Sequence, residues 1–178
     1  QAIIKNCGDS RVYLFRNGVL KRLTQDHNNL YHVVDYQTTE RDQDFFDNIS
    51  DIEQLSEDQK KIFNQRNQIC NYFGIANRFR PDTFFSDVID GDIFLLTTDG
   101  VHDNLTTDEI TRILSQHYNS SPSSMARALL HHSLLRSRDP KHDRHKPDDM
   151  TSIIVKVKTD QGKTKTSFNK ELFKPIIK

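Results

Sequence analysis

The chain has 178 residues, which is enough for one domain of ordinary size. Its 25 basic residues balance its 25 acidic residues, and this zero net charge argues against a protein whose main task is binding nucleic acid. No apolar run approaches the roughly 18 residues of a membrane span, and residues 1–20 lack the layout of a signal peptide. The two cysteines make no disulfide framework, so we expect a cytoplasmic protein. The balanced charge and the lack of a long apolar run lead us to expect no nucleic-acid or membrane partner.

The first part of the chain predicts an antiparallel meander of three strands. Ala2–Cys7, Val12–Arg16 and residues 19–24 are apolar stretches typical of strands. A Gly-Asp-Ser-Arg turn separates the first two, and Asn17-Gly18 predicts a tight hairpin between the last two. Polar residues follow, and apolar spacing then predicts a helix within residues 51–66.

The second half alternates strands and helices. The unbroken apolar run of residues 93–98 predicts a strand buried on both faces. Thr106 followed by Glu109 predicts a capping box at the start of a helix. A second helix is predicted to begin near Pro122 and to bury a stripe of Met125, Leu129, Leu130 and Leu134.

The chain closes with a strand around Ile154 and a lysine-rich tail. The mixture of strand meanders and helices predicts an α+β domain with antiparallel sheets. The domain is expected to cover residues 1–158, and residues 159–178 are expected to be peripheral.

Acidic residues stand where the predicted strands meet loops. Asp9 follows the first strand, Asp99 and Asp103 follow the buried strand, and Asp148 and Asp149 precede the last one. Carboxylates gathered at strand ends suit a hard divalent cation, because Mg²⁺ and Mn²⁺ prefer oxygen ligands. Each acid taken alone is equally compatible with an ordinary turn.

The segment after the buried strand has two further features. Gly100 would let the backbone turn sharply, so that Asp99 and Asp103 could face one cleft. The amide of Asn104 would stabilise that turn.

Three segments carry a family resemblance. "NCGDSRVYLFRNGVLKRLTQDHN", "GDIFLLTTDGVHDNLTTDEI" and "KPDDMTSIIVKV" resemble, in order, three motifs of the metal-dependent type 2C serine/threonine protein phosphatases. The similarity covers roughly residues 2–28 and 91–157. Residues 28–90 fall where that family has its variable flap, and there the similarity is faint.

The resemblance implies a sandwich of two antiparallel sheets covered by helices on both outer faces, in four αββα layers. It also implies two Mn²⁺ or Mg²⁺ ions, possibly three, which share a water that attacks a phosphorylated protein substrate. No nucleophilic side chain is needed.

The resemblance also assigns residues. Asp99 and Asp148 match acids of the two-metal centre, and Asp103 and Asp9 match acids associated with a third, weaker metal position. Asp149 stands where the family usually has Asn, and we expect it, with Gly100 and Asn104, to support the ligands. His102 replaces the family's usual Trp and is expected to lie exposed in a loop.

One family motif has no match here. The Asp-Gly-His-Gly-Gly motif, whose Asp and Gly supply primary metal ligands, is missing. We therefore expect an N-terminal half of the domain to be supplied from outside this chain, and we expect the chain alone to be inactive.

Three alternatives stay open at this point. The protein could be a catalytically inactive pseudophosphatase or scaffold of the same fold. A zinc site would need His131, His132, His142 and His145, whose spacing matches no common zinc pattern. The basic residues 136–146 could attract a phosphorylated substrate, although a solvated loop explains them equally well.

Overall fold

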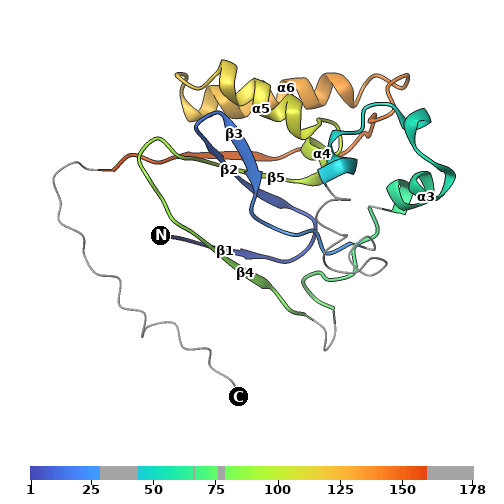
Figure 1. The fold of residues 1–178 in the computed structure, drawn as a ribbon, viewed down its shortest axis with the longest axis horizontal. Helices are drawn as coiled ribbons and strands as arrows, with labels where there is room; N and C mark the ends of the chain where they lie inside the picture. The colour runs from blue at the N-terminus through green and yellow to red at the C-terminus, as the bar shows by residue number, and fades with distance from the viewer. Residues whose placement is uncertain (29–43, 66, 76–78, 160–178) are drawn as a thin grey trace.

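The computed structural model describes residues 1–28, 44–65, 67–75 and 79–159, which form two antiparallel sheets with helices (Figure 1). One sheet has four strands in the order β3-β2-β5-β6, and the other pairs β1 with β4. The described strands are β1 (Ala2–Asn6), β2 (Arg11–Arg16), β3 (Val19–Arg22), β4 (Asp82–Ser86), β5 (Ile93–Thr97) and β6 (Ser152–Lys156).

Three layers are visible in the described part of the chain. Helices α5 (Thr107–Gln116) and α6 (Pro122–Arg136) cover one face of the four-stranded sheet, and the two-stranded sheet lies beyond the other face (Figure 1). The predicted α+β class with two antiparallel sheets is therefore confirmed. Among the described residues, helices form only one of the two outer layers that the four-layer architecture would have.

The predicted three-stranded meander is wrong in one respect. Strand β1 does not pair with β2, and its register runs instead along β4, from Ala2 opposite Ser86 to Asn6 opposite Asp82. The reason is that β2 is saturated on both edges, by β3 on one side and by β5 on the other. The β2–β3 hairpin itself is confirmed, and both residues of its Asn17-Gly18 turn have positive φ, as a type I′ turn requires.

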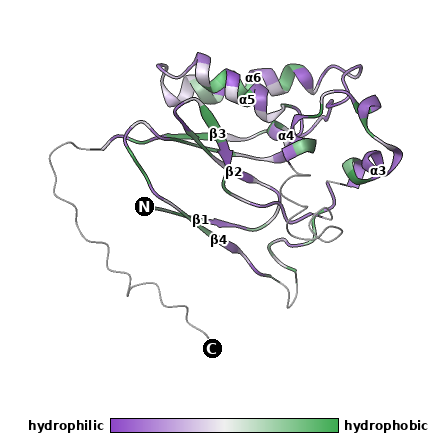
Figure 2. Cartoon of the chain, viewed as in Figure 1, coloured by the Kyte–Doolittle hydropathy of each residue, from purple (hydrophilic) through white to green (hydrophobic). Residues whose placement is uncertain are grey.

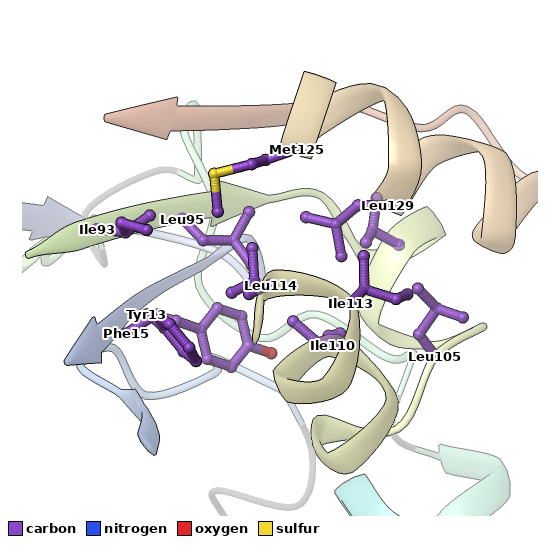
Figure 3. Close-up of a cluster of buried hydrophobic side chains, with 11 residues drawn as sticks. Tyr13, Phe15, Ile93, Leu95, Leu105, Ile110, Ile113, Leu114, Met125 and Leu129 are labelled. Carbon is purple, nitrogen blue, oxygen red and sulfur yellow. The ribbon is translucent and has the colours of Figure 1, made fainter. Parts of the chain in front are cut away.

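The hydrophobic core lies between the four-stranded sheet and helices α5 and α6 (Figure 3). The predicted burial of β5 on both faces is confirmed, since Ile93, Phe94 and Leu95 are all buried. Hydrophilic and hydrophobic residues are mixed along α5 and α6 (Figure 2). In α5, the buried residues Ile110, Ile113 and Leu114 lie at helical spacing on one face. Eleven buried residues build this core: Tyr13, Phe15, Ile93, Leu95, Val101, Leu105, Ile110, Ile113, Leu114, Met125 and Leu129.

Both helices begin as the sequence predicts. Thr106 and Glu109 form the capping box of α5, and Pro122 is the first residue of α6. The predicted stripe of α6 is wrong at Leu134, which is 40% exposed. Ser133 takes the inward position, because it follows Leu129 by one helical turn, and its hydroxyl donates to the Leu129 carbonyl.

Residues 44–65 form a side lobe with its own small core. Residues 44–48 are helical, and the predicted helix within 51–66 is divided into the 3₁₀ helix η1 (Ile52–Gln54) and α3 (Glu57–Gln65). The buried side chains of the lobe are Phe46, Ile49, Leu55 and Phe63.

Two predicted regions lie partly outside the described residues. The flap assigned to residues 28–90 is described only in part, and the tail is described only at Thr159, so both assignments stay predictions. Within the described ranges, no helix is both long and apolar enough to cross a bilayer.

Candidate functional site

The residues after β5 form one turn of helix, α4 (Asp99–His102), where the sequence predicted an irregular turn. The backbone N–H of Asp103 donates to the carbonyl of Asp99 at 2.8 Å, which is the helical spacing. Residues four apart lie on the same side of a helix, so the carboxylates of Asp99 and Asp103 are neighbours, as the sequence led us to expect.

The sheet register brings three acid-bearing loops to one edge. Thr97, at the end of β5, lies opposite Arg11 at the start of β2 and opposite Ser152 at the start of β6. The loops before β2, after β5 and before β6 are therefore adjacent. They carry Asp9, Asp99 and Asp148, respectively.

The side chain of Lys146 lies among the acids of two of these loops. Its Nζ is 2.7 Å from Oδ2 of Asp99, 2.6 Å from Oδ2 of Asp103 and 3.4 Å from Oδ2 of Asp148. Burial alone would lower the pKa of Lys146, but Asp103 and Asp99 outweigh it, so the pKa is raised. The three carboxylates thus converge on a permanent positive charge.

This role of Lys146 was not predicted from the sequence, where a solvated basic loop explained the residue. Its side chain is in fact only 19% exposed. The sequence signal for this role is the spacing between Lys146 and Asp148. A lysine two residues before an acid at a strand end can reach the acids of the neighbouring strand.

Gly100 and Asn104 hold the loop before β6 against α4. A Cβ on Gly100 would overlap with the backbone carbonyl of Asp149, so the glycine permits a close approach and does not serve a sharp turn. The Asn104 amide donates to the carbonyls of Gly100 (2.9 Å) and Lys146 (2.8 Å), and its oxygen accepts from the Lys146 N–H at 3.1 Å. The Asp149 side chain is exposed, and its carbonyl accepts from the Thr98 hydroxyl at 3.4 Å.

Asp9 borders a small cavity shared with Asp99 and Asp103. The cavity has a volume of about 20 Å³, which is room for a single water-sized group. Burial, followed by the negative charges of Asp99 and Asp26, raises the pKa of Asp9 to about 6. The same lining includes Arg11 and His102.

A buried ionic cluster supports this cavity. Arg11 reaches Asp26 at 2.6 Å and Asp47 at 3.0 Å, and Arg22 reaches Asp47 at 3.1 Å. Burial would lower the pKa of Arg11, but Asp26 and Asp47 raise it well above its ordinary value. The cluster ties β2 and β3 to the helical residues 44–48, and so to the side lobe.

Two further expectations are corrected. His102 is not an exposed loop residue: it is 2% exposed on α4, and its Nδ1 lies 2.9 Å from the Thr97 hydroxyl. Burial, together with the charge of Arg11, lowers its pKa well below the ordinary value, so the ring is neutral.

Arg144 is also buried and does not belong to a solvated basic loop. Its guanidinium donates to the carbonyls of Phe46, Ile49, His102 and Asp103 at 2.8–3.0 Å. Arg144 therefore fastens the side lobe to the end of α4.

The histidines considered for zinc do not gather around one point. His131 and His132 are adjacent on α6 with ring centroids 5.9 Å apart. Across the described residues, no group of three or more His, Cys, Asp or Glu side chains is arranged to hold a metal ion.

The family of the chain is shown by a match to a known family model. A family model described as "Stage II sporulation protein E (SpoIIE)" matches residues 55–158, which is more than half of the chain. The chain belongs to the SpoIIE family of type 2C phosphatases. The resemblance found in the sequence is thereby confirmed, and the SpoIIE match includes the second and third of the three motifs.

Curated relatives are serine/threonine phosphatases of greater length. The phosphatase stp of Listeria monocytogenes is 28% identical over 114 residues, covering 64% of this chain and 39% of the relative. A putative protein phosphatase 2C-type of Streptococcus pyogenes is 28% identical over 113 residues, with the same coverage. The chain thus spans less than half the length of the curated relatives that it matches.

Solved structures show the same architecture. The serine/threonine phosphatase Stp1 of Staphylococcus aureus superposes with a TM-score of 0.62 and 25% identity, covering 88% of this chain and 52% of that protein. The Streptococcus agalactiae serine/threonine phosphatase gives a TM-score of 0.60 at 22% identity, covering 87% and 54%. The SpoIIE-family chain therefore has the type 2C fold over most of its length.

Proposed function

We propose that the SpoIIE-family protein carrying this chain is a metal-dependent serine/threonine protein phosphatase, acting on phosphoserine and phosphothreonine of protein substrates in the cytoplasm. The observation that carries the proposal is the convergence of Asp99, Asp103 and Asp148 on a single point, with Asp9 across a small cavity. The similarity to curated serine/threonine phosphatases supports the reaction class.

The donor chemistry fits two Mn²⁺ or Mg²⁺ ions, with a third possible, because every acid at this edge offers carboxylate oxygens. When bound, such ions supply an activated water and screen the charge of the phosphate. The positions of the carboxylates suit metal ions less well than their oxygen chemistry does, because the ammonium of Lys146 lies at the point where Asp99 and Asp103 converge.

The residues have different expected tasks. Asp99 and Asp148 would hold the two principal ions, and Asp103 and Asp9 would hold a weaker third. Gly100, Asn104 and the backbone of Asp149 would fix the spacing of the two loops, through the contacts described above. No side-chain nucleophile is required of this chain.

We further propose that the rest of the domain completes the site. The relatives are more than twice as long as the segment matched here, so they contain residues that have no counterpart in this chain. A centre built from Asp99 and Asp148 alone lacks ligands, and the isolated chain is expected to be inactive.

The test is phosphate release from a phosphothreonine peptide by the full-length protein in Mn²⁺ buffer. Asp99→Asn should lower kcat/KM by at least about 100-fold, because each lost metal contact removes several kcal/mol of charge stabilisation. The control is Asp90→Asn, which alters the other, exposed Asp-Gly pair and should leave activity unchanged. Equal activity of wild type and Asp99→Asn would refute the phosphatase proposal. Turnover by residues 1–178 alone that is lost on Asp99→Ala would refute only the proposal that the rest of the domain is needed.

A pseudophosphatase or scaffold of the same fold is the second candidate. The observation that favours it is again Lys146, which already forms ion pairs with Asp99 and Asp103. Calorimetry with Mn²⁺ on the full-length protein separates the two, because a scaffold would show no binding.

A further inference from the structure

We propose that Lys146 is a built-in counter-cation, which must leave Asp99 and Asp103 before a divalent metal ion can bind them. This inference rests on the proposed function, because it concerns regulation of the same acids. It predicts that the chain itself sets the metal concentration at which the site fills.

Lys146 faces one particular oxygen of Asp99 and of Asp148. Oδ1 of Asp99 accepts the N–H of Gly100 at 3.0 Å, and Oδ1 of Asp148 accepts the N–H of Asp149 at 2.8 Å. In both acids, Oδ2 is the oxygen that faces Lys146. A metal ion that binds Oδ2 of these acids therefore competes with the ammonium for the same oxygens.

The contacts of Lys146 with Asp99 and Asp103 are short. The distances of 2.7 Å to Asp99 and 2.6 Å to Asp103 are those of charge-assisted hydrogen bonds. An ammonium has three N–H donors, and three carboxylates surround this one. Mg²⁺ would lie about 2.1 Å from the same oxygens, and two cations this close repel each other strongly.

The backbone position of Lys146 directs its side chain toward the acids. The residue is pinned by two hydrogen bonds between its peptide group and the amide of Asn104. The close contact of Gly100 with Asp149 fixes the other end of the loop. The contact is thus built into the fold and is not a chance approach of a long surface side chain.

The first experiment measures Mn²⁺ affinity by calorimetry or by the electron paramagnetic resonance of free Mn²⁺, on the full-length protein. Lys146→Met should bind Mn²⁺ about 10- to 100-fold more tightly than wild type, since two charge-assisted hydrogen bonds no longer compete. Lys141→Met is the matched control, because it removes the same charge from an exposed position of the same loop. It should change the affinity by less than about twofold, because exposed charges are screened.

A second measurement uses the wild-type protein and so does not depend on the folding of a variant. Limited acetylation followed by mass spectrometry reports how accessible each lysine amine is. In EDTA, Lys146 should react several-fold more slowly than Lys141. Saturating Mg²⁺ should release Lys146 and speed its acetylation, while the rate at Lys141 stays the same.

The outcomes are decisive in both directions. Unchanged Mn²⁺ affinity in Lys146→Met, including no binding by either protein, overturns the proposal, and so does a Lys146 acetylation rate that Mg²⁺ does not alter. Tight Mn²⁺ binding by Lys146→Met without phosphatase activity in wild type would support the counter-cation and refute the phosphatase. The two proposals therefore fail separately.

Discussion

The two faces of the four-stranded sheet differ in how completely they are covered. On the helix face, Tyr13, Ile93 and Leu95 are 0% exposed (Figure 3). On the opposite face, Ile153 and Val155 are 51% and 49% exposed. Strand β6 supplies both faces, because its Ile154 packs against the helix-side core. On the opposite face, Phe94 of β5 is only 7% exposed, so the exposure is concentrated at the edge strand β6.

The open face borders a wide groove between the two sheets. The groove has a volume of about 460 Å³, and nearly all of its lining is apolar, from β1, β2, β5 and β6. Apolar surface of this kind is usually covered in the working protein. The helix face is thus a finished core, whereas the other face leaves apolar side chains exposed in the described part of the chain.

The largest expected effect is on the finished face. Leu95→Ala should lower the free energy of unfolding of the full-length protein by about 3 kcal/mol, because it leaves a cavity under α5 and α6. Urea denaturation followed by circular dichroism measures the change. Leu135→Ala, on the 55% exposed surface of α6, is the control and should change stability by less than about 0.5 kcal/mol.

The second prediction tests whether the open face is covered in the whole protein. Val155→Asn should destabilise the full-length protein by about 1–3 kcal/mol, because a covered asparagine leaves polar groups unsatisfied. Val19→Asn, at a 65% exposed hairpin position, is the matched control. If the two variants unfold at the same urea concentration, the inter-sheet face is open to solvent and the comparison fails.

A smaller effect is expected where a helix of the finished face begins. The hydroxyl of Thr106 caps α5 by accepting the N–H of Glu109 at 3.1 Å. Thr106→Ala removes this cap and should lower the free energy of unfolding by about 1 kcal/mol. Thermal unfolding checks this, with Thr107→Ala as the neighbouring control. An equal melting temperature for both variants would show that packing alone fixes α5.

The smallest effect near neutral pH concerns Tyr13, which lies in the finished core. Burial raises its pKa to about 12, only partly offset by the charge of Arg11. A raised pKa favours the protonated phenol in the folded state, so its contribution to stability is complete below about pH 10 and is lost as the pH rises through 12. Absorbance of tyrosinate should show a late step that Tyr13→Phe removes; an unchanged titration curve would contradict it.

Local patterns carried the correct predictions. The Asn17-Gly18 hairpin, the capping box of α5 and the double burial of β5 depend on residues close in sequence, so spacing and residue type suffice. The clustering of Asp99 and Asp103 belongs to the same class, because one helical turn brings them together.

The wrong predictions depend on contacts between distant parts of the chain. Nothing local shows that β2 is already paired on both edges, and this decides that β1 joins β4. Similarly, the sequence suggested that Arg144 and Lys146 are solvated, because their partners are distant in sequence. Arg144 bonds to residues 46–49 and α4, and Lys146 bonds to Asp99 of α4. A basic residue is predicted to be exposed unless its acceptors can be found, and here they lie far away in the sequence.

The saturation of β2 also has a consequence for folding. The β2–β3 hairpin joins neighbouring residues and can form early, whereas β2 meets β5 only after a long loop has closed, which is slow. Asp9, Asp99 and Asp148 come to one edge only through the β2–β5 pairing and the addition of β6. A chain in which these distant strands are not yet paired cannot hold the three acids together, so the site depends on long-range pairing and not on any local segment.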